Sequence, residues 1–325
     1  MSRALLCTAL AGDFSGVQIV ERDVLPPGPG EIRVRMRAAA LNFPDLLMTQ
    51  GKYQLKPELP FTPGMEGAGE IEALGAGVHG LAVGDHVVVA SRYGMMAERV
   101  NVPAAALRPK AQAMSWAEAA SYPAAWLTAY VSLVRRGSLQ AGETLLVHGA
   151  AGGVGMAAVD LGLRMGATVI ATAGSQAKLD VLTLRGAHHV INSASGFRDE
   201  VKQLTHGRGV DVVYDPVGGD VFDESVRCMA FDGRLLVIGF TSGRIPSVSV
   251  NMPLIKGFSV VGVRAGEYGR QFPEKGRENV AAVDRLAHEG KIKPHVGLSV
   301  PLSQAVDAFR ALSERRVIGK AVVTF

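Results

Sequence analysis

The sequence predicts an α/β fold that combines a doubly wound parallel (Rossmann) sheet of about six strands with an irregular β-barrel. The first observation is an apolar run, residues 145–147, that leads directly into a glycine-rich loop and then into a helix-forming stretch. The second is the alternation of strand-like and helical stretches from residue 124 onward. The third is the strand-rich character of residues 1–123, which Gly and Pro interrupt repeatedly.

The N-terminal part contains several short predicted strands. Residues 1–7 are typical of a strand, and residues 32–37 alternate apolar and basic side chains, so one face is expected to be buried and the other wet. Further strands are expected at residues 67–75 and, after a turn, at residues 86–89. Together these stretches predict a barrel with short helices.

The C-terminal part alternates strands with helices and then returns to the barrel. Strands are predicted at residues 145–147, 167–172, 190–191, 210–215, 234–239 and 258–263. The tail is expected to form helices at residues 279–290 and 302–312 and a last strand at residues 320–325. We therefore expect a barrel domain of residues 1–123 joined by residues 264–325, and a dinucleotide-binding domain of residues 124–263.

The loop after residue 147 has the features of a dinucleotide-binding turn. Gly152 lets the backbone approach a pyrophosphate, and Gly155 lets the helix pack closely on the strand. The helix N-terminus offers unpaired N–H groups and a partial positive charge to phosphates. Ala150 stands where the usual GxGxxG pattern has its first Gly, and the alternative is a glycine-rich turn of any α/β protein. The backbone positions expected to contact the cofactor are Ala151, Gly152, Gly153 and Val154.

The end of the second predicted strand indicates NADPH as the cofactor. NAD-binding domains usually carry Asp or Glu there, bonded to the ribose 2′-OH. Between Gly155 and Lys178 the only acid is Asp160, which falls within the predicted helix. Gly174, Ser175 and Lys178 stand at the strand end instead, and a hydroxyl and a cation suit a 2′-phosphate. The alternative for Lys178 is a solvated lysine at the start of a helix.

Composition narrows the class of protein. The chain has 325 residues, 48% of them hydrophobic, and a net charge of +4, without a run of basic residues that would indicate a nucleic-acid surface. No signal peptide and no apolar stretch of membrane-spanning length is visible, so we expect a soluble, cytoplasmic protein. Cys7 and Cys228 are far apart and are expected to be free thiols.

Six stretches of the chain form a specific combination, namely residues 40–47, 51–53, 60–69, 127–130, 144–155 and 211–219. On these stretches nearly the whole chain resembles the medium-chain dehydrogenase/reductase superfamily, and within it the zinc-free, NADPH-dependent quinone oxidoreductase branch. The resemblance implies a GroES-like barrel as the catalytic domain. Zinc alcohol dehydrogenases carry a Cys and a His where this chain has Asn42 and Met65, and their structural zinc lobe is missing after Tyr93, so no metal is expected.

The resemblance also implies roles for individual residues. Asn42 and Tyr53 match positions that line the nicotinamide end of the site and are expected to be catalytic, through hydrogen bonds to a carbonyl oxygen. The alternatives are a helix cap for Asn42 and a packing aromatic for Tyr53. Thr128 would hold the nicotinamide carboxamide, and Arg315 would lie near the adenosine phosphate. Strand ends supply the remaining expected cofactor contacts, which are Gly239, Phe240, Thr241, Val263 and Arg264.

These observations predict an oxidoreductase that transfers a hydride from NADPH to a quinone or similar conjugated carbonyl acceptor, without a metal. An NADPH-dependent enone or enoyl-thioester reductase is the alternative within enzymes. A different class is an NADPH-binding regulatory or RNA-binding protein without turnover. Relatives commonly pair through the last strand of the sheet, so a homodimer through residues 258–263 is expected. Candidate walls of an apolar acceptor pocket, with interdomain packing as the alternative, are Phe61, Met95, Met96, Trp126 and Phe240.

Overall fold

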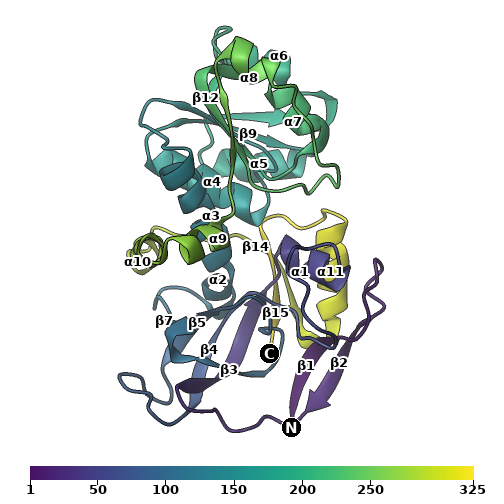
Figure 1. Ribbon diagram of the computed structural model, residues 1–325, viewed down its shortest axis with the longest axis vertical. Coiled ribbons are helices and arrows are strands. Elements are labelled where there is room, and N and C mark those ends of the chain that lie inside the picture. Colours follow the sequence, from purple (N-terminus) through teal and green to yellow (C-terminus); the bar gives the residue numbers. More distant parts are fainter. The chain divides into compact units, whose positions relative to one another are not determined.

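The computed structural model describes residues 1–325, and the chain divides into two compact units (Figure 1). Unit 1 contains residues 1–124 and 284–325, and unit 2 contains residues 125–283. The return to the first unit begins at Asp284, whereas we expected it to begin at residue 264. None of the helices is both long and apolar enough to cross a membrane.

Unit 2 is built on a six-stranded sheet in which every neighbouring pair is parallel. The strand order is β10-β9-β8-β11-β12-β13, so the chain adds β9 and β10 on one side of β8 and then β11, β12 and β13 on the other side. The order therefore reverses between β8 and β11. Strand β8 is buried along its whole length, as its apolar run predicted. The doubly wound sheet is therefore confirmed. Its strands are β8 (Thr144–Val147), β9 (Thr168–Ala173), β10 (His189–Asn192), β11 (Val210–Asp215), β12 (Met229–Val237) and β13 (Ser259–Gly262).

Helices connect the parallel strands of unit 2 (Figure 1). Helix α4 contacts β8 and β9, and its buried side chains are Met156, Ala157, Ala158, Val159 and Leu161. Helix α5 contacts β9 and β10, while α7 and α8 contact β11 and β12 respectively. The helices between residues 123 and 288 are α3 (Pro123–Tyr130), the π-helix η2 (Val131–Arg136), α4 (Gly153–Arg164), α5 (Gln176–Leu184), the 3-10 turn η3 (Ser193–Ser195), α6 (Arg198–Leu204), α7 (Gly219–Ser225), α8 (Asn251–Lys256), α9 (Ala265–Gln271) and α10 (Pro273–His288).

Unit 1 has a mostly antiparallel seven-stranded sheet and a separate two-stranded hairpin of β1 and β2. The sheet follows the order β14-β15-β3-β4-β5-β7, and β6 also pairs with β3. The C-terminal strand β15 lies antiparallel to β3, which confirms that the tail returns to the strand-rich part. The strands are β1 (Ser2–Cys7), β2 (Val17–Arg22), β3 (Glu31–Ala40), β4 (Glu66–Leu74), β5 (His86–Ala90), β6 (Arg99–Pro103), β7 (Leu107–Pro109), β14 (Val296–Pro301) and β15 (Lys320–Thr324).

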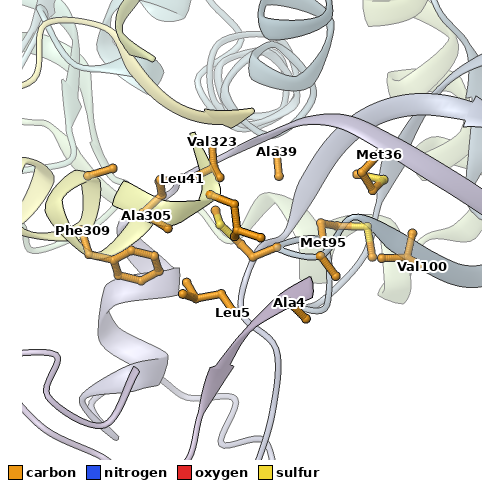
Figure 2. Close-up of a cluster of buried hydrophobic side chains, with 14 of the residues drawn as sticks. Ala4, Leu5, Met36, Ala39, Leu41, Met95, Val100, Ala305, Phe309 and Val323 are labelled. Carbon is orange, nitrogen blue, oxygen red and sulfur yellow. The ribbon is translucent and has the colours of Figure 1, made fainter. Parts of the chain in front are cut away.

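The core of unit 1 gathers side chains from both ends of the chain (Figure 2). Phe309, Leu5 and Val323 come from a late helix, the first strand and the last strand, and all three are buried. Met95 and Met96 are also buried in this core, which favours packing over the acceptor-pocket role that we considered for them. The helices of unit 1 are α1 (Phe43–Thr49), η1 (Ala104–Ala106), α2 (Trp116–Ser121), η4 (Leu302–Gln304) and α11 (Ala305–Ser313).

Candidate active site

The glycine loop of unit 2 ends in the N-terminus of α4. Gly152 is the N-cap residue, and the first hydrogen bond of the helix runs from the N–H of Met156 to the Gly152 carbonyl oxygen, at 2.8 Å. The N–H groups of residues 153–155 precede that bond and therefore have no acceptor within the helix. Free N–H groups at the positive end of a helix dipole suit an anion such as a pyrophosphate.

Close packing at the loop explains the position of one glycine. A Cβ atom added at Gly155 would lie 2.4 Å from the carbonyl oxygen of Gly149 and 2.7 Å from the Cα of Ala150. A Cβ at Gly152 would meet only the Gly149 oxygen, at 3.4 Å. Gly155 therefore lets the helix start against the loop, whereas Gly152 leaves its outer side open to a ligand.

The other expected cofactor contacts of unit 2 lie at the same edge of the sheet. Because all strands are parallel, the glycine loop and residues 173–175, 239–241 and 263–264 all follow carboxyl ends. The N–H of Thr241 donates to the Pro216 carbonyl at 3.1 Å, which joins the loop after β12 to the segment that follows β11. The order reverses between β8 and β11, and open α/β sheets bind ligands at such a switch point. The fold thus places these predicted residues along one edge of the sheet.

A buried histidine, which the sequence analysis did not identify, holds the start of the glycine loop through hydrogen bonds. His148 immediately precedes the glycines and is fully buried. Its Nε2 lies 2.8 Å from Ser225 Oγ and its Nδ1 lies 2.9 Å from Thr172 Oγ1. Ser225 gives its own proton to the Val221 carbonyl, so it accepts from Nε2–H, and Thr172 donates to Nδ1. Burial lowers the pKa of His148 to about 3, so the imidazole is neutral and links three elements.

The end of strand β9 carries the residues that we expect to contact a 2′-phosphate. Gly174 and Ser175 are exposed, and Lys178 lies half-buried in the first turn of α5. Asp160 lies in α4, as predicted, and its carboxylate accepts from Arg185 Nε at 2.9 Å. This acid is therefore engaged within the helical layer and is not the ribose-binding carboxylate of NAD-specific domains.

Unit 1 places Asn42 in a polar cluster with two charged residues. The Asn42 Nδ2 donates to Glu66 Oε1 at 2.9 Å, and Lys320 Nζ donates to Asn42 Oδ1 at 2.7 Å. Lys320 also donates to Glu66 Oε1 at 2.8 Å, and the side chains of this ion pair are only 7% and 1% exposed. The sequence offers a weak signal for Lys320, which is the only charge on its strand, and none for Glu66, whose strand also carries Glu70 and Glu72.

The backbone around Asn42 is fixed by a buried acid. The Asp45 carboxylate accepts from the N–H of Asn42 at 2.8 Å and from the N–H of Gly64 at 3.0 Å. Asn42 is the N-cap residue of α1 and forms a capping box with Asp45, so the helix-cap alternative that we considered for Asn42 is part of its role. Burial raises the pKa of Asp45 to about 7.

The remaining predicted residues lie in different surroundings. Tyr53 follows α1, is half-buried and packs against the core of unit 1. Thr128 is half-buried in α3. Arg315 follows α11 in unit 1, is exposed and has a left-handed φ of 58°. Arg264 is exposed and lies 3.8 Å from Glu267 in an ion pair.

Both units of the chain match families of known proteins. Residues 28–112 match the family model described as alcohol dehydrogenase GroES-like domain, and residues 153–282 match the model described as zinc-binding dehydrogenase. The chain is 37% identical over 324 residues to quinone oxidoreductase-like protein 2 of Mus musculus, covering 99% of this chain and 92% of that protein.

Solved structures are similar over the same length. The Escherichia coli quinone oxidoreductase complexed with NADPH has a TM-score of 0.90 and 29% identity, covering 99% of this chain and 100% of that one. The CurK enoyl reductase has a TM-score of 0.89 and 28% identity, covering 99% of each chain. The likeness therefore extends through both units.

The residues present do not fit a zinc ion, although one matching model is described by zinc. Zinc sites use Cys, His, Asp or Glu ligands. At the positions where zinc alcohol dehydrogenases have Cys and His, this chain has Asn42 and Met65. The adjacent Glu66 carboxylate accepts from Lys320, Asn42 and the Ala124 N–H. No group of three or more His, Cys, Asp or Glu side chains is arranged to hold a metal.

Proposed function

The chain belongs to the zinc-free quinone oxidoreductase branch of the medium-chain dehydrogenase/reductase superfamily, and we propose that it transfers a hydride from NADPH to a quinone or similar conjugated carbonyl. The main support for this proposal is the glycine loop at the start of α4, which lies at the switch point of a parallel sheet. NADPH supplies the hydride when bound. The protein's task is to bind that cofactor, orient the acceptor and exclude water.

The cofactor-binding residues proposed here have distinct tasks. The N–H groups at the start of α4 hold the pyrophosphate, and Ser175 and Lys178 hold the 2′-phosphate. Thr128 holds the nicotinamide carboxamide. Backbone and side chains at the ends of β12 and β13 and after α11 complete the set, which consists of Gly239, Phe240, Thr241, Val263, Arg264 and Arg315.

Asn42 and Tyr53 are the proposed acceptor-orienting residues. Each carries a hydrogen-bond donor suited to a carbonyl oxygen on which negative charge develops during hydride transfer. Support comes from the Asn42 side chain, which is held by two charged partners. Neither residue requires a metal for this role.

Reduction of an enone or enoyl thioester is the second candidate, because the chain is similar to the CurK enoyl reductase as well as to quinone oxidoreductases. That reaction also needs a proton at the α-carbon, and Tyr53 is the proposed donor. Steady-state NADPH oxidation with a panel of quinones and a panel of enoyl thioesters separates the two. A higher kcat/KM with enoyl thioesters favours the second candidate, and no turnover with any acceptor refutes both.

We also propose a homodimer formed through β13. This strand is the edge of the sheet, so one row of its N–H and C=O groups has no partner strand within the chain. Val260 on this strand is 39% exposed, and large apolar side chains nearby in the fold are exposed as well. An antiparallel copy of the same edge would pair these backbone groups and cover the apolar surface. The exposed residues are Phe231, Val250, Leu254 and Ile255.

A further inference from the structure

The Asn42 side chain is held by groups with opposite hydrogen-bonding character. Lys320 can only donate, and it donates to Asn42 Oδ1 at 2.7 Å. An ionised Glu66 can only accept, and its Oε1 accepts from Asn42 Nδ2 at 2.9 Å. A reversed amide would place its NH₂ group against an ammonium and its oxygen against a carboxylate. The pair therefore permits only one orientation of the amide.

We propose that Glu66 and Lys320 are positioning residues that hold Asn42 with its second amide N–H available to the acceptor oxygen. This inference rests on the proposed function of Asn42. One Nδ2 proton is used by Glu66, and the other has no acceptor within the protein. The ammonium on Oδ1 also polarises the amide, which makes the remaining N–H a stronger donor.

The ion pair is buried where separate parts of unit 1 meet. Glu66 opens β4, Lys320 opens β15, and Asn42 precedes α1, so three separate segments meet at the cluster. The second carboxylate oxygen of Glu66 accepts from the N–H of Ala124 at 2.7 Å, which fixes the carboxylate plane. Both charged side chains are more than nine-tenths buried. Such a support can hold the amide to within the small tolerance that catalysis requires.

Stability alone does not account for this ion pair. Removing two charges from water is costly, and apolar pairs of similar volume are often equally stable or more so. Breaking only one partner leaves an uncompensated buried charge and strongly destabilises a fold. The informative change is therefore a paired one, Glu66→Gln with Lys320→Met, which removes both charges and nearly preserves volume.

The test is a mutant cycle between this paired change and Asn42→Ala, with quinone turnover as the readout. The paired change should lower kcat roughly three- to tenfold, the effect of losing one oriented neutral hydrogen bond, and leave the KM for NADPH within about twofold. In the Asn42→Ala background the same paired change should alter kcat by less than about twofold, because the residue it positions is gone. Lys320→Arg, which keeps a donating cation, should retain most of the activity.

A matched control lies on the same strand. Glu72, also on β4, forms an ion pair with Arg99 at 2.9 Å, away from Asn42. The control change Glu72→Gln with Arg99→Met should leave kcat unchanged in both backgrounds. Equal kcat losses from the Glu66/Lys320 change with and without Asn42 would overturn the proposal, as would an unchanged kcat in Asn42→Ala.

A spectroscopic measurement of the Asn42 amide tests this inference separately from the proposed function. With asparagine labelled at the side-chain nitrogen, the two Asn42 amide protons should be strongly inequivalent, because only one is bonded to a carboxylate. The Glu66/Lys320 change should shift them, and the control change should not. An unchanged Asn42 signal overturns the positioning role even if turnover falls. A shifted signal in a protein that reduces no acceptor supports the positioning role while refuting the proposed reaction.

Discussion

Cofactor preference can be tested at the end of β9. NADPH and NADH differ only in the 2′-phosphate, so a residue that contacts this group should discriminate between them. Lys178 is half-buried in the first turn of α5, and Ser175 is the N-cap residue of that helix, with no capping hydrogen bond from its side chain. The change Lys178→Ala removes the cation and should weaken NADPH binding while leaving NADH binding nearly unchanged.

The magnitude follows from the kind of contact. A charge-assisted hydrogen bond contributes roughly 1.5–3 kcal/mol, which corresponds to a change in dissociation constant of roughly tenfold to a hundredfold. Because Lys178 is partly exposed, solvent screening favours the lower part of this range. Fluorescence titration of the purified protein with each reduced cofactor measures both dissociation constants directly.

The reverse change adds a carboxylate at the same place. A Cβ atom at Gly174 would meet no heavy atom within 4 Å, so Gly174→Asp is sterically permitted. The new carboxylate would repel the 2′-phosphate and accept from a ribose 2′-OH, so the preference should turn toward NADH. Lys202→Ala, which removes an exposed lysine on α6, is the charge control and should affect neither cofactor. Equal binding of NADPH and NADH by the wild type, or equal weakening of both by Lys178→Ala, would refute this reasoning.

Three further predictions concern the acceptor, the assembly and the sheet. Tyr53→Phe should lower quinone turnover about tenfold at most, because one neutral hydrogen bond is lost. If Tyr53 donates a proton to an enoyl thioester, the same change should lower turnover of that substrate roughly 10²–10⁴-fold. An unchanged rate with every acceptor removes Tyr53 from the mechanism. Val260→Lys should convert a dimer to a monomer in sedimentation equilibrium, because it places a charge on the proposed strand edge, and a wild type that sediments as a single chain at micromolar concentration contradicts the dimer. Burial raises the pKa of Asp215 from 3.8 to about 6, so its stabilising contribution is complete below the unfolded-state pKa and is lost as the pH rises through about 6. Relative to Asp215→Asn, the wild type should therefore lose on the order of 3 kcal/mol of unfolding free energy between pH 4 and pH 7 in urea titrations, and parallel pH profiles for the two proteins would contradict this.

The sequence by itself determined the parallel sheet and the position of its glycine loop. A strand buried on both faces needs an unbroken apolar run, and residues 145–147 supply one. Gly155 is required by a contact between near neighbours in the chain, since its Cβ would strike Gly149 and Ala150. The absence of an acidic residue at the end of β9 was also visible in the sequence, because this strand, its loop and the next helix follow one another along the chain. Local sequence is sufficient wherever the interacting groups are close along the chain.

Only the tertiary structure decided which residues surround Asn42. Lys320 lies 278 residues away, and Glu66 lies 24 residues away on another strand. Their meeting depends on the pairing of β15 with β3 and of β3 with β4, and strand register over such separations is set by packing of the whole unit. The same reason explains why Met95 and Met96, apolar in any reading, proved to be core residues, and why the return to unit 1 begins at Asp284. Burial depends on how the sheets and helices pack against one another. The sequence of apolar and polar residues specifies only which side chains can be buried without a large cost.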